Sequence, residues 1–198
     1  MKLLIFTRYP EAGRVKSRLI PALGAEGAQS LHRLMTEHTL QRLDGFAGLE
    51  VCYDGGGERC MRKWLGNKLS YSPQGEGDLG KRLLRAFSRC FKQGEDKIVV
   101  VGTDCPGLTA FHVQEALQLL DDYDVVLGPA VDGGYYLICL GALYEELFVN
   151  ISWGTSQVLQ ETLEKAELLG LKTILLEKLA DVDRPEDLTV WDAFREIS

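Results

Sequence analysis

A basic loop follows the first apolar segment of the chain and is the clearest candidate for binding a charged ligand. Residues 8 to 18 hold four cations, which are Arg8, Arg14, Lys16 and Arg18. Glu11 is the only carboxylate among them, so this segment has a formal charge of +3. Arginine offers a planar fork and lysine a point charge, and both bind phosphate oxygens. With Gly13 in the loop and the N–H groups of a following helix as further donors, we expect phosphate binding; the alternative is a solvated surface loop.

Carboxylates at two further places could hold a metal ion. Asp104 follows the apolar run 99–101 and Gly102, which lets a ligand approach the backbone. Because Mg²⁺ binds one or two carboxylates together with substrate phosphates, we expect Asp104 to be a Mg²⁺ ligand rather than a helix cap. Asp181 and Asp183 lie two residues apart in an extended segment, so both could face one cation. Taken alone, this pair is better explained by capping of the following helix.

The segment from Gly75 to Gly80 reads as G-x-G-x-x-G, the pattern of dinucleotide-binding turns. Pro73 and Gln74 separate it from a short strand, and Asp78 would place a carboxylate near a pyrophosphate. We therefore expect a turn in which Asp78 is the N-cap of the next helix, or a loop that lines another ligand.

A second glycine-rich segment, residues 128–136, also follows a strand. Asp132 in this segment is a candidate base. Gly133 and Gly134 would let a substrate approach the backbone, and Tyr135 offers stacking area and a hydroxyl. Asp-Gly is also the dipeptide most typical of a β-hairpin. The pattern leaves an acceptor site and an ordinary hairpin equally open.

Apolar runs and helical spacing alternate along the chain and predict the elements that position these residues. We expect strands at residues 2–7, 50–53, 69–72, 97–101, 125–127, 135–139 and 173–176. We expect helices at residues 26–43, 58–65, 79–91, 111–120, 156–169 and 185–194. This alternation is typical of βαβ units and a mainly parallel sheet, in which ligands bind at the carboxyl ends of the strands.

The composition of the whole chain limits the classes of protein. Its 198 residues have a formal net charge of −7 and are 45% hydrophobic, which favours one globular domain over residues 1–198. A nucleic-acid polymer as partner would need a basic face, and no apolar run approaches the ~18 residues of a membrane span. The five cysteines form no CxxC pair, so we expect reduced thiols and a cytoplasmic location. The histidines are scattered, and we expect His38 to be packed within a helix rather than to bind a metal.

Several of these motifs together resemble, in order, an uncharacterised bacterial glycosyltransferase-like family related to 2-phospho-lactate guanylyltransferase. The motifs are residues 10–19, 77–80, 102–106, 128–136 and 153–155. Residues 181–188 are similar to the ending of nucleotidyltransferases of the molybdenum-cofactor guanylyltransferase type. The resemblance implies the GT-A fold of nucleotide-diphospho-sugar transferases. This is a single-domain, Rossmann-like α/β fold whose mixed, mostly parallel sheet is flanked by helices.

The resemblance also implies a role for each motif. Lys16 and Arg18 would bind phosphates and act in catalysis, and Asp104 and Asp183 would hold Mg²⁺ or Mn²⁺. Asp132 would act on the acceptor side. Acceptor-side positions beside it would be Gly133, Gly134 and Tyr135. Further nucleotide-binding positions would be Arg8, Gly13, Gln74, Gly75, Asp78 and Thr103. The small departures from the family pattern, at Ser17, Thr103 and Gly154, leave the expected fold and nucleotide binding intact.

These features predict a metal-dependent transferase that moves a nucleotidyl group from a nucleoside triphosphate to a small phosphorylated or acidic acceptor. The first alternative is a glycosyltransferase with a nucleotide-diphospho-sugar donor and Asp132 as base. The motif that holds Asp104 lacks the Asp-x-Asp usual mid-chain in such enzymes, which favours nucleotidyl transfer. The second alternative is a nucleotide-binding module without turnover, which the intact cations and carboxylates disfavour. The sequence does not predict the base, the acceptor or the oligomeric state.

Overall fold

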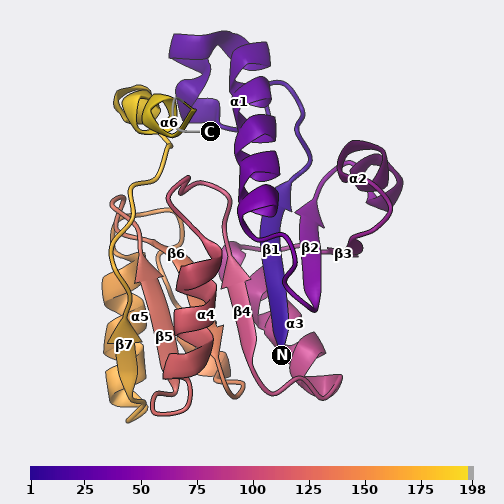
Figure 1. The fold of residues 1–198 in the computed structure, drawn as a ribbon. Coiled ribbons are helices and arrows are strands. Elements are labelled where there is room, and N and C mark those ends of the chain that lie inside the picture. The colour runs from indigo at the N-terminus through magenta and orange to yellow at the C-terminus, as the bar shows by residue number, and fades with distance from the viewer. Residues whose placement is uncertain (196–198) are drawn as a thin grey trace.

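Strand β1 (Lys2–Arg8) begins the chain and lies inside a sheet, as its continuous apolar run predicts. The structure is a computed structural model that describes residues 1–195, so residues 196–198 of the expected domain lie outside it. Within the described residues, seven strands form one sheet in the order β3-β2-β1-β4-β6-β5-β7 (Figure 1). The other strands are β2 (Leu49–Asp54), β3 (Ser70–Pro73), β4 (Ile98–Val101), β5 (Val125–Pro129), β6 (Tyr135–Leu140) and β7 (Thr173–Leu175). Strand β6 is antiparallel to β4 and β5 while the other pairs are parallel, which confirms the expected mixed sheet.

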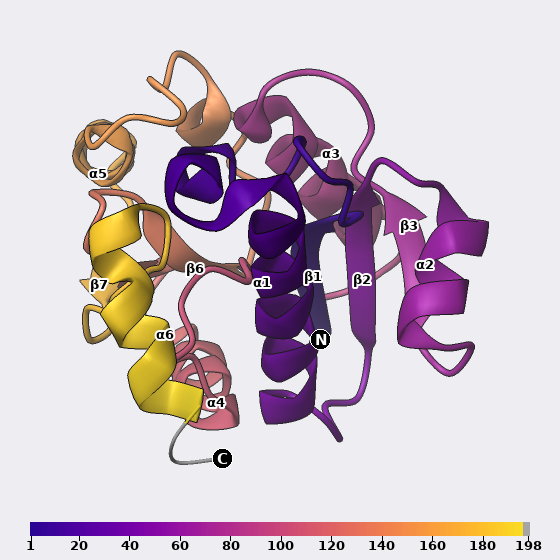
Figure 2. The same cartoon turned by 90° about the horizontal axis from the view of Figure 1, so that it is seen from above.

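Helices cover both faces of this sheet. They are α1 (Ile20–Arg42), α2 (Glu58–Leu65), α3 (Leu79–Lys92), α4 (Ala110–Leu119), α5 (Val158–Leu168) and α6 (Leu188–Arg195). Helices α3 and α5 share one core cluster with Leu4 and Phe6 of β1. Helix α4 and the region at the end of α1 share the other with Leu3 and Ile5. Successive residues of a strand point to opposite faces, so a strand such as β1 contributes to both cores. Figure 2 shows α3 and α5 on one side of the sheet and α1 and α4 on the other.

Helix α1 begins six residues earlier than the sequence predicts, at Ile20 instead of Glu26. Pro21 stands in its first turn, where the missing N–H is not needed. Gly24 then interrupts the helix with φ 71° and ψ 170°, a conformation that favours glycine. The regular part of α1 therefore begins just after Gly24, close to the predicted start. The extra turn before it carries the chain from the basic loop back onto the sheet.

The remaining expectations for the scaffold concern single side chains. The ring of His38 packs edge-on against Trp191 of α6 with centroids 5.6 Å apart, and its Nε2 lies 3.0 Å from the Pro106 carbonyl oxygen. The expectation of a packed helix histidine is therefore confirmed. All five cysteines are free thiols. Within residues 1–195, no helix combines the length and the apolar character needed to cross a membrane.

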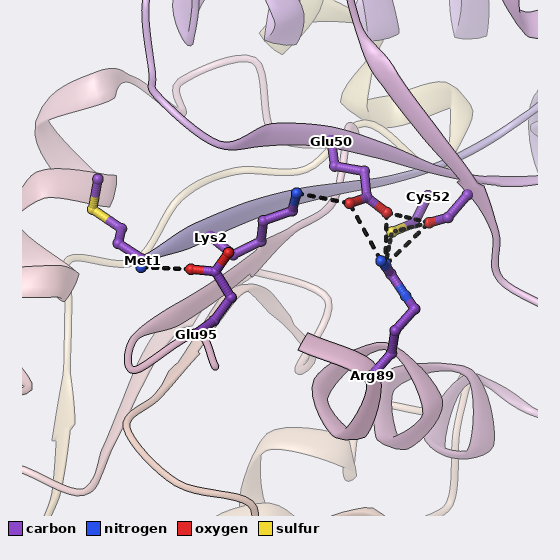
Figure 3. Close-up of polar contacts among 7 residues, drawn as sticks. Met1, Lys2, Glu50, Cys52, Arg89 and Glu95 are labelled. Atoms are coloured by element: carbon purple, nitrogen blue, oxygen red, sulfur yellow. Dashed lines mark hydrogen bonds and ion pairs between the residues drawn. The ribbon is translucent and has the colours of Figure 1, made fainter. Parts of the chain in front are cut away.

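A buried carboxylate ties together the amino ends of the strands, at the opposite edge of the sheet from the basic loop. The side chain of Glu50 on β2 is 6% exposed and lies 2.9 Å from the Lys2 ammonium and 2.6 Å from the Arg89 guanidinium (Figure 3). The Ser72 hydroxyl of β3 also donates to it. Burial alone would raise the pKa of Glu50, but hydrogen bonds from Arg89, Ser72 and Lys2 outweigh burial and hold the pKa below its usual range. This one side chain joins β1, β2, β3 and α3.

Replacement Glu50→Gln is expected to lower the free energy of unfolding by about 3 kcal/mol, because Lys2 and Arg89 would lose their buried counter-charge. The native pKa is lowered, so the stabilisation is complete above the pKa of an unfolded glutamate and is lost as pH falls through the native pKa. The difference between wild type and variant in urea titrations should therefore shrink below about pH 4. Glu58→Gln, which breaks an exposed pair with Arg62 on α2, is the control and should cost less than about 0.5 kcal/mol. Equal losses in the two variants would contradict this assignment.

Candidate active site

The carboxyl ends of the strands border a cleft with a volume of about 740 Å³. This lies within the range of about 300–1,000 Å³ that is usual for small-molecule sites, and the crevice at the strand ends is where open α/β sheets bind ligands. Most of the predicted site residues line it, namely Arg8, Lys16, Arg18, Gln74, Asp78, Thr103, Asp104, Asp132, Gly134, Tyr135 and Asp183. Segments far apart in the sequence are thus brought to one place, as expected from their position after strands.

Three predicted glycines lie outside the lining of the cleft and shape the loops around it. Gly13, Gly75 and Gly133 have φ values of 80°, 79° and 91°, which favour glycine. A Cβ atom on Gly133 would lie 2.3 Å from the carbonyl oxygen of Ser156, and one on Gly75 would lie 2.6 Å from the Arg85 guanidinium. The structure therefore gives these glycines a conformational role next to the site.

Lys16 connects three segments at the centre of the cleft. Its ammonium lies 2.7 Å from Asp104 Oδ1 at the end of β4 and donates to the carbonyl oxygen of Val182. The backbone N–H of Val182 in turn donates to the Asp104 carbonyl oxygen at 2.9 Å. The side chain of Lys16 is 4% exposed, and its backbone has the left-handed φ of 48° that non-glycine residues rarely adopt. Lys16 thus joins the basic loop, β4 and residues 181–183.

Arg18 forms a second ion pair of the same kind, with Asp183. The hydrogen bond from Arg18 to Asp183 raises the pKa of the guanidinium, which stays charged in any case. Capping does not explain Asp183, because the Asp187 carboxylate accepts from the N–H groups of Asp183 and Arg184 at this helix start. Capping does not explain Asp104 either, since Thr109 is the N-cap of α4. Both carboxylates are therefore available to the cleft.

Six carboxylates line the cleft, and four of them follow β4 or lie in the segments 130–134 and 181–183, namely Asp104, Asp132, Asp181 and Asp183. Asp181 is 8% exposed and accepts a hydrogen bond from the Asp132 backbone N–H at 3.1 Å. Burial raises the pKa of Asp181, and the negative charge of Asp132 raises it further. Within residues 1–195, no group of three or more His, Cys, Asp and Glu side chains is arranged to hold a metal ion. The carboxylates of Asp104 and Asp183 have the donor chemistry that Mg²⁺ takes, and Mg²⁺ needs only one or two carboxylates when substrate phosphates supply other oxygens.

The G-x-G-x-x-G segment forms a turn at the rim of the cleft. Asp78 Oδ1 accepts from the Lys81 N–H at 2.8 Å, so the predicted N-cap of α3 is confirmed. Gln74 is buried, and its amide nitrogen donates to the carbonyl oxygens of Thr7 at 3.0 Å and Cys52 at 2.9 Å. Gln74 therefore connects the ends of β1 and β2, and its amide nitrogen already donates two hydrogen bonds within the protein.

Sequence reasoning missed two charged residues of the cleft, Asp54 and Arg82. Asp54 Oδ2 lies 2.9 Å from Arg8 and 2.8 Å from Arg82. Burial would raise the pKa of Asp54, but Arg82 and Arg8 together outweigh burial and lower it. Arg82 also donates to the carbonyl oxygen of Gly77 and to the side chain of Gln74. Asp54 ends β2, and a carboxylate at the end of a strand beside glycine is the signal that pointed to Asp104. Arg82 had no such signal because it lies within a helix.

The segment around Asp132 is both a hairpin and a wall of the cleft. Strands β5 and β6 are antiparallel neighbours, and Asp132 Oδ1 accepts from the Gly134 N–H at 2.8 Å within their connection. The two interpretations left open by the sequence are thus compatible. The expected hydroxyl contribution of Tyr135 is wrong, because that hydroxyl is buried beside Thr162 of α5 and its pKa is raised by burial. Tyr135 can offer only its ring, which packs edge-on against Trp153.

Comparison with known families matches residues 39–155, more than half of the chain, to the family described as "Uncharacterized protein conserved in bacteria (DUF2064)". The chain belongs to this family. It is also 26% identical over 178 residues to a 2-phospho-L-lactate guanylyltransferase of Methanocaldococcus jannaschii, which covers 88% of this chain and 75% of that protein. The protein of that name in Methanocaldococcus sp. FS406-22 is 28% identical over 112 residues, which are 54% of this chain and 48% of the relative. In that second case the match spans about half the length of the relative.

Solved structures agree with this relationship. A "putative nucleotide-diphospho-sugar transferase" from Desulfovibrio desulfuricans G20 is 36% identical, with a TM-score of 0.91 over 96% of this chain and 87% of that chain. A cytidylyltransferase from Leptospira borgpetersenii is 14% identical, with a TM-score of 0.63 over 97% of this chain and 84% of that chain, and shows the fold alone. The chain is thus a homologue of a guanylyltransferase with a nucleotidyltransferase-like fold. The predicted family and fold class are confirmed, and the names of these homologues support the predicted transferase class.

Replacement Asp181→Asn is expected to stabilise the protein in the absence of ligands, raising Tm by roughly 2–4 °C at pH 7.5. The native pKa of Asp181 is raised, so its ionised form destabilises the folded state above that pKa, and the penalty fades as pH falls towards the unfolded pKa. The gain should therefore disappear in acid, as followed by thermal unfolding between pH 4 and 8. Asparagine keeps the oxygen that accepts from Asp132. Asp122→Asn, on an exposed turn, is the control; a lower Tm for Asp181→Asn alone would contradict this prediction.

Proposed function

We propose that this protein is a metal-dependent nucleotidyltransferase that transfers a nucleotidyl group from a nucleoside triphosphate to a small phosphorylated or acidic acceptor. The observation that carries the proposal is the meeting of Lys16 and Arg18 with Asp104 and Asp183 at the strand ends. Two cations suit phosphates and two carboxylates suit a hard cation, so this group of side chains has the chemistry needed for a metal-bound triphosphate. The guanylyltransferase names of the Methanocaldococcus relatives support the same class of reaction.

In this proposal, Lys16 and Arg18 bind the triphosphate and stabilise the negative charge that develops on the departing pyrophosphate. Lys16 is held by its contact with the Val182 carbonyl, so its ammonium is positioned before the substrate arrives. Positioned charges of this kind need no reorganisation during the reaction, which is why they lower its barrier. Asp104 and Asp183 would hold Mg²⁺ or Mn²⁺. When bound, that ion would offset phosphate charge.

The acceptor would approach from the side of the hairpin, where Asp132, Tyr135 and Trp153 line the cleft. An oxygen of the acceptor attacks the α-phosphorus, a new P–O bond forms, and the bond to the bridging oxygen of the pyrophosphate breaks. A phosphate or carboxylate acceptor is already ionised and needs no base. An acceptor hydroxyl would pass its proton to a base, for which Asp132 is the candidate. The chain's main contribution is then orientation and electrostatics rather than a protein nucleophile.

Glycosyl transfer from a nucleotide-diphospho-sugar is the second candidate. Its support is the 36% identical structure from Desulfovibrio desulfuricans G20, whose name refers to such a transferase. The same cleft would hold the donor, with Asp132 as the base that accepts the proton of an acceptor hydroxyl.

A thermal-shift panel separates the two candidates. Nucleoside triphosphates and UDP-, GDP- and CDP-sugars would each be added with and without Mg²⁺. We expect the largest rise in Tm with one triphosphate plus Mg²⁺, since a ligand that binds the folded state stabilises it by mass action. Release of pyrophosphate with candidate acceptors would then follow. A response to sugar nucleotides alone favours glycosyl transfer, and a response to neither class contradicts both.

Replacement Lys16→Ala is expected to lower kcat/KM for pyrophosphate release by about 100- to 1,000-fold, in line with the loss of one positioned charge at a reacting group. Circular dichroism would verify that the variant is folded, and Arg18→Ala, at a more exposed position, should lose activity in the same direction. Lys68→Ala, which removes an exposed lysine outside the cleft, is the matched control and should retain activity. Near-normal kinetics of both Lys16→Ala and Arg18→Ala would remove these residues from the phosphate role.

A further inference from the structure

The charges that would bind substrate and metal are already paired with each other. Lys16 is paired with Asp104, and Arg18 with Asp183. In each pair the cation belongs to the predicted phosphate site and the carboxylate to the predicted metal site. The partners are far apart in sequence, so the pairing arises where the basic loop, the end of β4 and residues 181–183 meet.

Each pair has one sheltered and one accessible member. The side chain of Lys16 is 4% exposed while that of Asp104 is 54% exposed. The second pair is reversed, with Arg18 at 53% and Asp183 at 25%. A sheltered charge that loses its partner is strongly disfavoured, because water cannot replace the lost interaction fully. Neither Lys16 nor Asp183 can therefore give up its partner without a replacement of the same sign.

This arrangement has different consequences for one ligand and for two. A triphosphate alone at Lys16 meets the negative charge of Asp104, and a divalent cation alone at Asp104 meets the positive charge of Lys16. When both arrive, phosphate oxygens replace the carboxylates beside Lys16 and Arg18, and the metal replaces the cations beside Asp104 and Asp183. Each of these four side chains then has an oppositely charged neighbour both before and after the ligands bind.

We propose, building on the proposed function, that Asp104 and Asp183 hold the place of phosphate in the empty cleft, so that divalent metal and nucleotide bind by a coupled exchange of ion-pair partners. The triphosphate releases the two carboxylates for the metal, and the metal releases the two cations for the triphosphate. The two carboxylates thus have a second role besides metal binding, which is to weaken the binding of metal-free nucleotide.

The surrounding contacts allow this exchange without a large movement. Lys16 keeps its hydrogen bond to the neutral Val182 carbonyl when Asp104 leaves. The backbone of Asp104 is held by the Val182 N–H at 2.9 Å, so a rotation of its side chain is enough. The left-handed backbone of Lys16, with φ 48° and ψ 43°, is an uncommon conformation of the kind found at sites where a side chain must be held in place.

The decisive measurement is the affinity for metal-free triphosphates in EDTA, by isothermal titration calorimetry. The probes are GTP, CTP and inorganic tripolyphosphate, applied to wild type, Asp104→Asn and Asp183→Asn. Asparagine keeps the size of the side chain but frees the paired cation, so we expect the dissociation constant to fall by roughly 5- to 50-fold, within the usual range of coupling between sites. Asp122→Asn removes a carboxylate on an exposed turn outside the cleft, and it should change affinity less than about 3-fold.

The reciprocal measurement uses the metal alone. In Arg18→Met, Asp183 loses its cationic partner. Electron paramagnetic resonance of Mn²⁺ without nucleotide should therefore give a dissociation constant at least roughly 5-fold lower for Arg18→Met than for wild type. Arg14→Met is the matched control, because Arg14 belongs to the same basic loop but pairs with Glu11, and it should bind Mn²⁺ as wild type does. Arg18 is half exposed, so its variant tests the exchange without disturbing the buried lysine.

The outcomes separate this proposal from the proposed function. If wild type binds nucleotide with Mg²⁺, but Asp104→Asn and Asp183→Asn bind metal-free triphosphate no more tightly than Asp122→Asn, the proposed exchange is wrong and the proposal of nucleotide binding stands. If no probe binds to wild type with Mg²⁺, both proposals are wrong. Tighter metal-free binding in the two variants, together with tighter Mn²⁺ binding in Arg18→Met alone, supports the exchange.

Discussion

The buried ammonium of Lys16 is the interaction on which the geometry of the site depends. It bridges a carboxylate at the end of β4 and a carbonyl of an extended segment near the end of the chain. That segment is also bound directly to β4 through Val182 and Asp104. The cleft therefore has its cations and carboxylates close together because one lysine, in a conformation unusual for its type, holds three segments in contact.

Charged side chains have opposite effects on stability at the amino and carboxyl ends of the strands. At the amino ends of the strands, Glu50 is surrounded by two cations and a hydroxyl, and its pKa is lowered. At the carboxyl ends, Asp181 lies beside the negative charge of Asp132 and its pKa is raised. The first arrangement stabilises the fold and the second destabilises it. Repelling carboxylates at one edge are consistent with a site that stabilises its ligand rather than its empty state.

The fold was largely predictable because the strands are apolar runs and the helices have one apolar face. The early start of α1 was missed because Gly24 interrupts the helix, so the turn before it does not continue the apolar periodicity of the rest of α1. Residues at strand ends were predictable because parallel strands bring their carboxyl ends together. Arg82 was not predictable, because an arginine within a helix is usually a solvated surface residue. Only the tertiary structure places it beside Asp54 and Gln74. The pairing of each cation with a carboxylate depends on tertiary contacts alone.

The charge of the cleft determines how this acidic protein would bind the polyanion that we propose as its substrate. Its lining has five cationic side chains, Arg8, Arg14, Lys16, Arg18 and Arg82, and six carboxylates, from Asp54, Asp78, Asp104, Asp132, Asp181 and Asp183, for a formal charge of −1. The net charge of −7 for the whole chain adds no attraction for a free nucleotide. Favourable binding must then come from short-range contacts with individual cations and from neutralisation of the carboxylates. In the proposed function, a divalent ion that arrives with the nucleotide would provide that neutralisation, and the acidic cleft would then distinguish metal-bound from metal-free nucleotide.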